Sequence, residues 1–146
     1  MSFFATIFQS KYVTVPALTW FIAQMAKLVF ALVKYKELDF RRLYGTGGMP
    51  SSHTSYVVSL CVVIGKSAGA NSAVFGLSFA FALIVMSDAA GVRQAAGKQA
   101  KLINTLMSTH FPGEAFNERL KELIGHKPLE VLIGAILGLV MGLALG

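Results

Sequence analysis

The sequence predicts an all-α integral membrane protein: a polytopic bundle of about four transmembrane helices, with an amphipathic helix at the membrane interface. Of its 146 residues, 55% are hydrophobic and only 14% are charged, whereas an ordinary soluble domain has about 25% charged residues. The mean hydropathy of +0.63 excludes a disordered chain. The apolar residues also form long runs between short polar segments. We therefore expect residues 1–146 to form a single membrane domain.

The first predicted span covers residues 12–33 and contains one charge, Lys27. Its length suits one crossing, which takes about 20 apolar residues. The other predicted spans are shorter and include small or polar neighbours; they cover residues 53–69, 72–88 and 129–146. A soluble four-helix bundle is the alternative, but its helices would need a polar face, and residues 73–86 offer only Ser78.

A more polar composition distinguishes the segment between the third and fourth spans, residues 91–128. Within it, apolar residues recur at helical spacing among charged ones, at Phe116, Leu120, Leu123 and Ile124. This pattern is typical of a helix that lies in the membrane interface. It is equally typical of a solvated connecting helix, and the sequence leaves both interpretations open.

The net charge of +6 is concentrated at one end of the predicted bundle. With four spans, residues 34–50 and 87–128 share one side of the membrane and hold ten of the 13 Lys and Arg residues, whereas the other side holds Lys11 and Lys66. Cationic loops favour the cytoplasm, so we expect a bacterial plasma-membrane protein with both termini outside. Cationic residues that bind an anionic substrate would also raise the number of Lys and Arg residues on this side, so topology and substrate binding would both contribute to the count. Nucleic acid is not an expected partner, because its binders carry their cations on polar, soluble folds.

Three short motifs at the charged end suit phosphate chemistry: GTGGMPSSH at residues 45–53, DAAGVR at 88–93 and GHKPLE at 125–130. His53 and His126 stand at the predicted starts of helices, where free N–H groups attract anions. Histidine can act as nucleophile or acid, and arginine can hold phosphate oxygens. Each motif also has a structural explanation, namely a capped helix start, an interfacial arginine and a surface His–Glu pair.

These motifs together resemble the type 2 phosphatidic acid phosphatase superfamily, and in particular its divergent branch. Residues 50–53, Pro-Ser-Ser-His, are similar to the central superfamily motif Pro-Ser-Gly-His. The superfamily is related to acid phosphatases and vanadium-dependent haloperoxidases, and the resemblance covers nearly the whole chain. It implies a phosphatase that needs no metal or other cofactor and that vanadate inhibits as a phosphate mimic.

The resemblance also implies a role for each matching residue. His126 would be the nucleophile that forms a phosphohistidine, oriented by Glu130, where the superfamily usually has Asp. His53 would protonate the leaving alkoxide and later activate water. Arg93 would bind phosphate oxygens with support from Asp88. The other candidates for phosphate binding are Ser51, Ser52, Gly48, Lys27, Lys34 and Arg41. Lys34 and Arg41 have the spacing of a further superfamily motif, but Arg42 stands where Pro is expected, and Lys27 competes for the role of the lysine.

We therefore expect a lipid-phosphate phosphatase that acts on a phosphomonoester or diphosphate of a membrane lipid. A non-catalytic protein that binds or transports such a lipid is the second hypothesis. The expected partners are the bilayer and a phosphorylated lipid. The sequence also leaves open a homodimer, because superfamily members typically have six helices and this chain has about four spans.

Overall fold

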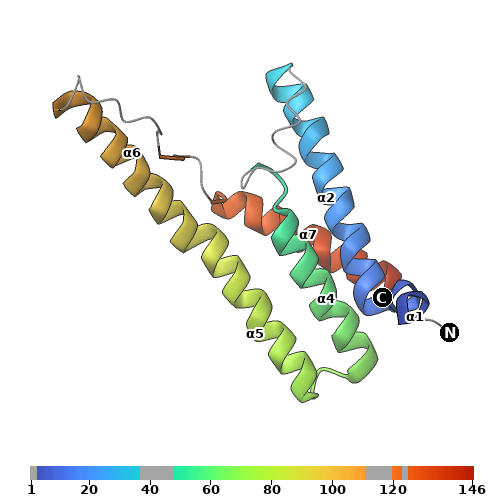
Figure 1. Ribbon diagram of the computed structural model, residues 1–146. Helices are drawn as coiled ribbons and strands as arrows, with labels where there is room; N and C mark the ends of the chain where they lie inside the picture. Colours follow the sequence, from blue (N-terminus) through green and yellow to red (C-terminus); the bar gives the residue numbers. More distant parts are fainter. Residues whose placement is uncertain (1–2, 37–47, 111–119, 123–124) are drawn as a thin grey trace.

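The fold is helical, as predicted (Figure 1). The computed structural model describes residues 3–36, 48–110, 120–122 and 125–146. Its elements are α1 (Phe3–Gln9), α2 (Lys11–Tyr35), α4 (Ser52–Ala68), α5 (Ala73–Ser87), the π-helical turn η1 (Asp88–Val92), α6 (Arg93–His110) and α7 (Pro128–Leu145).

Helix α4 lies at the centre of the bundle, where α2, α5 and α7 all pack against it. Helices α2, α4 and α5 alternate in direction, so the C-terminal end of α2 lies at the same end of the bundle as the start of α4, and the start of α7 lies at this end too (Figure 1). At the other end, the Lys66 ammonium donates to the carbonyl oxygens of Leu143 and Gly146, both at 2.8 Å. A helical bundle is the architecture that the sequence predicts.

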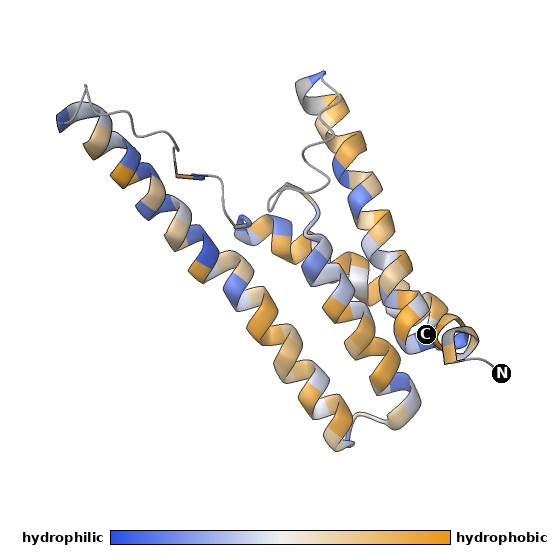
Figure 2. Ribbon diagram, viewed as in Figure 1, coloured by the Kyte–Doolittle hydropathy of each residue, from blue (hydrophilic) through white to orange (hydrophobic). Residues whose placement is uncertain are grey.

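Polar groups occupy the interior of the bundle and large apolar side chains cover its outside. Thr19, Lys27 and Ser59 are buried, whereas Phe79, Ile84 and many other apolar residues are exposed. Lipid is as apolar as these side chains, so their exposure carries no penalty in a bilayer. Among the described residues, three segments are long and apolar enough to cross a membrane: Lys11–Val33, Ala73–His110 and Pro128–Leu145. In Figure 2, hydrophobic residues likewise predominate along α5, the first part of the segment Ala73–His110.

The second predicted span, residues 53–69, corresponds to α4 but differs from the other three. Its 17 residues extend about 25 Å, whereas the hydrocarbon core is about 30 Å thick. One face of α4 carries Ser51, Ser55 and Ser59, which are buried within the bundle. A helix enclosed by protein needs less apolar surface than one that faces lipid, which explains why its hydropathy is weaker.

A tight seam joins α4 to α7. Gly134, Gly138 and Gly142 recur every four residues and are all buried. A Cβ atom at Gly138 would lie 2.6 Å from the carbonyl oxygen of Ser55. Small residues thus let the two backbones approach closely, a common way of packing helices in membranes.

The third predicted span, residues 72–88, is continued by a helix that the sequence analysis did not expect. Segment Ala73–His110 is continuous for 38 residues, or about 57 Å, so it extends beyond the bundle (Figure 1). Figure 2 shows α5 as predominantly hydrophobic and α6 as mixed. The helix continues because residues 93–110 are rich in Ala, Gln, Lys and Leu and contain no proline.

The predicted interfacial helix around residues 116–124 lies mostly outside the described residues. Residues 120–122 are described and are not helical. They lie beside α6, where the Asn104 amide donates to the Leu120 carbonyl and the Glu122 carboxylate and accepts from the Leu120 N–H. Residues 120–122 therefore form a non-helical segment that is hydrogen-bonded to α6, where the sequence pattern suggested part of a helix.

Candidate functional site

The three motifs meet at one cavity of about 270 Å³ at the end of the bundle where α4 begins. His53 comes from α4, Asp88 is the first residue of η1, Arg93 directly follows η1, and His126 precedes α7. The remaining lining residues are apolar: Ile84, Val85 and Ala89. Side chains that are 73 positions apart in the sequence therefore face one volume, and this volume could hold an anionic group.

The PSSH motif forms the start of α4. Ser51 is the N-cap, and its hydroxyl accepts hydrogen bonds from the Thr54 N–H and the Thr54 hydroxyl. The Ser51 N–H donates to the Glu130 carbonyl at 3.0 Å, which joins this motif to the GHKPLE motif. Ser51 was predicted to bind phosphate; here it is fully buried, with its hydroxyl occupied by capping, and it does not line the cavity.

Lys27 reaches the same motif from the middle of α2. Its ammonium donates to the Ser52 hydroxyl at 3.2 Å, and both residues are buried. A buried charge in a membrane protein is costly and marks functional positions. Gly48 lies beside the Lys27 side chain and has a φ of 89°, which favours glycine. Of the three cations that the sequence leaves as alternatives, Lys27 is the one whose side chain the structure describes, and it lies at the motif. The side chain of Lys34 and all of Arg41 lie outside the described residues.

The DAAGVR motif forms the π-helical turn. The Arg93 N–H donates to the Asp88 carbonyl, and this five-residue hydrogen bond widens the helix locally. The Arg93 guanidinium donates through Nε to the Asp88 carboxylate. Asp88 thereby holds the plane of the guanidinium, while the two Nη groups remain for a phosphate.

The wider turn also holds the third motif. The His126 N–H donates to the Ala89 carbonyl at 2.9 Å. Gly125, with a φ of 97°, fits closely against the start of α6, because a Cβ atom there would lie 2.7 Å from the Gln94 nitrogen. Sequence reasoning missed the roles of Ala89 and Gly125, although both belong to the motifs that it singled out.

His126 and Glu130 make the contact that their spacing suggested, but they do so by a different geometry. His126 lies two residues before α7, outside the helix, and its Nδ1 is 3.0 Å from Glu130 Oε2. The same carboxylate oxygen accepts from the Lys127 N–H and so caps α7. A carboxylate oxygen accepts a hydrogen bond from Nδ1–H, so this contact favours the tautomer that carries its proton on Nδ1 and the lone pair on Nε2. Nε2 is buried and has no hydrogen-bond partner of ordinary geometry among the described residues.

Burial also controls the charge of this ring. His126 is 3% exposed, and its burial lowers its pKa below the ordinary value of 6.5. The hydrogen bond to Glu130 raises the pKa, and the positive charge of Lys27 lowers it further. The net effect favours a neutral imidazole at neutral pH, the form in which Nε2 can act as a nucleophile.

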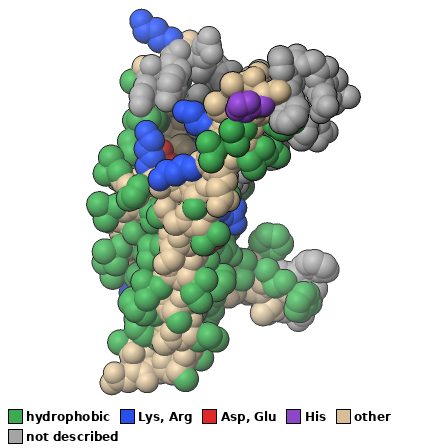
Figure 3. Space-filling model, turned by 90° about the vertical axis from the view of Figure 1, so that its left-hand side faces the viewer, with side chains coloured by type: hydrophobic (Ala, Val, Ile, Leu, Met, Phe, Trp, Pro, Cys, Tyr) green, Lys and Arg blue, Asp and Glu red, His purple; other side chains and the backbone are tan. Residues whose placement is uncertain are grey.

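Exposed cations extend from the cavity along α6. Arg93, Lys98 and Lys101 are all exposed. In Figure 3, which shows the face formed by α5 and α6, cationic side chains gather in the upper part and hydrophobic side chains cover the lower part. An anionic headgroup would thus meet favourable potential at the end of an otherwise apolar surface.

Comparisons with known proteins identify relatives of the chain. Residues 8–141 match the family described as the Divergent PAP2 family. A protein of Bacillus subtilis (strain 168), named "Uncharacterized membrane protein YuiD", is 38% identical over 135 residues, which cover 84% of this chain and 85% of that protein. No solved structure matches the chain. Together with the apolar helices, the membrane-protein relative supports an integral membrane location.

Proposed function

The chain belongs to the Divergent PAP2 family, which indicates a phosphatase-related role, and from this membership we propose that it is a lipid-phosphate phosphatase. The proposed reaction is hydrolysis of a phosphomonoester or diphosphate of a membrane lipid through a phosphohistidine. The observation that carries the proposal is the state of His126. One nitrogen of its buried ring is held by Glu130. The other makes no hydrogen bond of ordinary geometry among the described residues, although the Gly48 backbone lies near the ring, and it stands beside a cavity that contains Arg93 and His53.

In the first step, His126 Nε2 attacks the phosphorus and the bond from phosphorus to the ester oxygen breaks. His53, in its protonated form, gives a proton to the departing oxygen, which leaves as an alcohol. Arg93 balances the charge on the phosphoryl oxygens. Charge stabilisation of this kind and proton transfer from a positioned histidine are the usual contributions of a protein to phosphoryl transfer.

In the second step, water attacks the phosphohistidine. His53, now neutral, takes a proton from that water, the P–N bond breaks and phosphate leaves. Both histidines then return to their starting protonation states. Glu130 stabilises the positive charge that His126 carries while Nε2 is bonded to phosphorus, so its carboxylate acts in both steps.

The position of the cavity favours a lipid over a soluble substrate. It lies at one end of helices whose outer faces are apolar, so it would meet phosphate groups at the membrane surface. The exposed cations of α6 would attract the same groups. A phosphate ester whose hydrocarbon part remains in the bilayer fits both features.

Purified protein in mixed micelles tests this proposal. We expect it to release inorganic phosphate from a lipid phosphate, to do so in the presence of EDTA, and to be inhibited by vanadate. His126→Ala should lower kcat by about 10⁴-fold or more, by analogy with the loss of other catalytic nucleophiles.

His110→Ala is the matched control, because His110 is exposed at the end of α6, away from the cavity. It should retain the wild-type rate. Equal rates for His126→Ala and His110→Ala would contradict the assignment of the nucleophile. Saturable binding of the lipid phosphate without phosphate release would instead identify a non-catalytic binding protein.

A further inference from the structure

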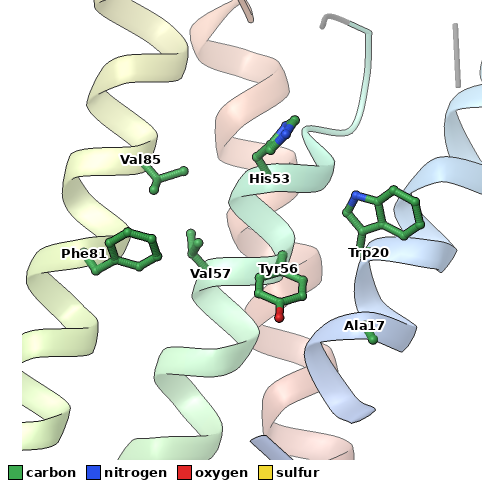
Figure 4. Close-up of a pocket in the computed structure, with 7 residues that line it drawn as sticks. All are labelled: Ala17, Trp20, His53, Tyr56, Val57, Phe81 and Val85. Atoms are coloured by element: carbon green, nitrogen blue, oxygen red, sulfur yellow. The ribbon is translucent and has the colours of Figure 1, made fainter. Parts of the chain in front are cut away.

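We call the cavity that His53, Arg93 and His126 line the phosphate cavity. A second cavity, of about 420 Å³, lies next to it. Ala17 and Trp20 of α2 form one side, Tyr56 and Val57 of α4 form the floor, and Phe81 of α5 lies opposite (Figure 4). Its lining is almost entirely apolar. We call this volume the apolar cleft. Because α2 and α5 each pack on α4, the cleft is the space that remains between them.

The apolar cleft adjoins the phosphate cavity, because His53 and Val85 line both. Helical spacing explains why the two cavities are neighbours. Tyr56 and Val57 follow His53 by three and four residues and so share its face of α4. On α5, Val85 follows Phe81 by four residues. His53 stands at one end of the cleft in Figure 4, at the point where the two volumes meet.

We propose that the apolar cleft holds the part of the hydrocarbon chain that adjoins the phosphate of the lipid substrate. The proposal rests on the proposed function, because the headgroup must occupy the phosphate cavity. His53 lies where the two parts of such a molecule join, which is where the ester oxygen that it protonates would be. Trp20 and Phe81 are 42% and 52% exposed, so the cleft is open to the side, and a lipid could enter from the bilayer.

Orientation is what the cleft contributes. A chain that moves from bilayer to cleft gains no hydrophobic free energy, because lipid is already apolar. Holding the first carbons against Trp20 and Tyr56 does, however, direct the ester oxygen toward His53, and correct orientation accelerates a reaction. Long-chain phosphates should therefore be better substrates than short water-soluble ones, and filling the cleft should remove this advantage.

Ala17→Phe fills the cleft, and Ala80→Phe is its matched control, since Ala80 is exposed on α5 and does not line the cleft. We expect Ala17→Phe to lower kcat/KM by about tenfold for a long-chain phosphate and to leave kcat/KM for a short alkyl phosphate unchanged. Ala80→Phe should change neither value. Equal effects of Ala17→Phe on both substrates, or no effect on either, would overturn the cleft proposal while phosphate release still upheld the proposed function.

Fluorescence gives a second test that does not depend on turnover, because Trp20 is the one tryptophan of the chain. A lipid phosphate with a brominated chain should quench Trp20 in vesicles at a mole fraction about tenfold lower than brominated phosphatidylcholine, a difference of about 1.4 kcal/mol. This preference without any phosphate release would support the cleft and contradict hydrolysis. Equal quenching by the two lipids would mean that ordinary bilayer lipid fills the cleft, and would overturn the proposal.

Discussion

His126 is positioned by contacts from three parts of the chain. Its N–H is held by the Ala89 carbonyl of η1, its Nδ1 by Glu130 of α7, and its backbone follows Gly125, which fits against α6. A buried polar side chain with this many constraints keeps a single orientation, and preorganisation of this kind is what a nucleophile requires. The fold therefore fixes His126 in the single orientation that the proposed nucleophile would need.

Glu130→Gln distinguishes two roles of Glu130: the orientation of His126 by a charged carboxylate and the capping of α7. Glutamine can still cap α7, so we expect a stable protein. Its neutral amide cannot stabilise the charge on His126, and kcat should fall about 10²- to 10⁴-fold with little change in KM. Glu130→Asp, which keeps the charge, should recover part of the rate. A wild-type kcat for Glu130→Gln, measured by phosphate release, would contradict the role of the carboxylate.

The pH dependence of kcat/KM follows from the lowered pKa of His126. Protonation of Nε2 removes its lone pair, so activity requires the neutral ring. Because burial lowers the pKa of His126 below 6.5, the acidic limb of the profile should lie below pH 6.5.

Lys27→Met removes a positive charge that lowers this same pKa. The acidic limb should therefore move to higher pH in this variant, whatever the change in the plateau rate. An acidic limb that stays in place, or that moves to lower pH, would show that His126 does not control it.

The chemistry-bearing residues of the site can be predicted from the sequence, but their local geometry cannot. The motifs pointed to His53, Arg93 and His126, and the structure brings these residues to one cavity. The His126–Glu130 contact was expected within a helix, yet α7 begins only at Pro128. Proline has no N–H to donate and is favoured in a first turn, so the chain before it is free to fold back onto η1.

The role of Ser51 shows why a motif alone is not enough. Serine at the start of a helix can bind a phosphate or cap the helix, and the sequence is the same in both cases. Its hydroxyl is here committed to Thr54, a contact that depends on where α4 begins. Boundaries of this kind are set by packing and are only weakly determined by the local sequence.

At the scale of elements, η1 joins the bundle to the site. The π-helical turn leaves the Ala89 carbonyl available to His126 and places Arg93 beside Asp88. Turns of this kind often occur at functional positions. No period in the sequence distinguishes such a turn from an ordinary helix, which is why the continuation of α5 into α6 was not anticipated.

The glycine seam between α4 and α7 fixes the position along the helix axes at which the PSSH and GHKPLE motifs meet. Gly138→Leu would force the backbones apart, since even a Cβ atom would lie 2.6 Å from the Ser55 carbonyl. We expect it to destabilise the protein by about 1–3 kcal/mol and to lower activity. A thermal unfolding scan in detergent measures the change in stability.

Gly76→Leu is the control for this substitution, because a Cβ at Gly76 would meet no described atom within 4 Å apart from its chain neighbours and the backbone of its own helix. It should leave Tm nearly unchanged or raise it, as glycine disfavours helices. Equal Tm values for the two variants would contradict the importance of the seam.

At the scale of the whole molecule, the fold separates an apolar body from a charged end. Composition and hydrophobic runs were enough to predict this division, because membrane helices need about 20 apolar residues whatever their neighbours. Composition could not reveal that α4, at 17 residues, is enclosed by the other helices. The central position of α4 depends on which helix faces pack together. The serine residues along one face of α4 did not by themselves indicate that this helix is enclosed.

The sidedness of the protein remains a prediction that labelling can test. Cys61 is buried, so an exposed cysteine introduced elsewhere would report its own location. Lys101→Cys on α6 should react with a membrane-impermeant maleimide only after the cells are permeabilised, whereas Ala70→Cys at the opposite end should react in intact cells. The reverse pattern would place the charged end, and the site with it, outside.

Covalent trapping of a phosphorylated intermediate tests the assignment of His126 as the nucleophile. Protein mixed with a lipid phosphate that is labelled on phosphorus, then quenched in alkali, should carry a label that is stable to base and lost in acid, as expected for phosphohistidine. We expect this label in the wild type and in His110→Ala, and we expect it to be absent in His126→Ala. Turnover of the lipid without a label on the wild type, or a label that persists in His126→Ala, would contradict this assignment.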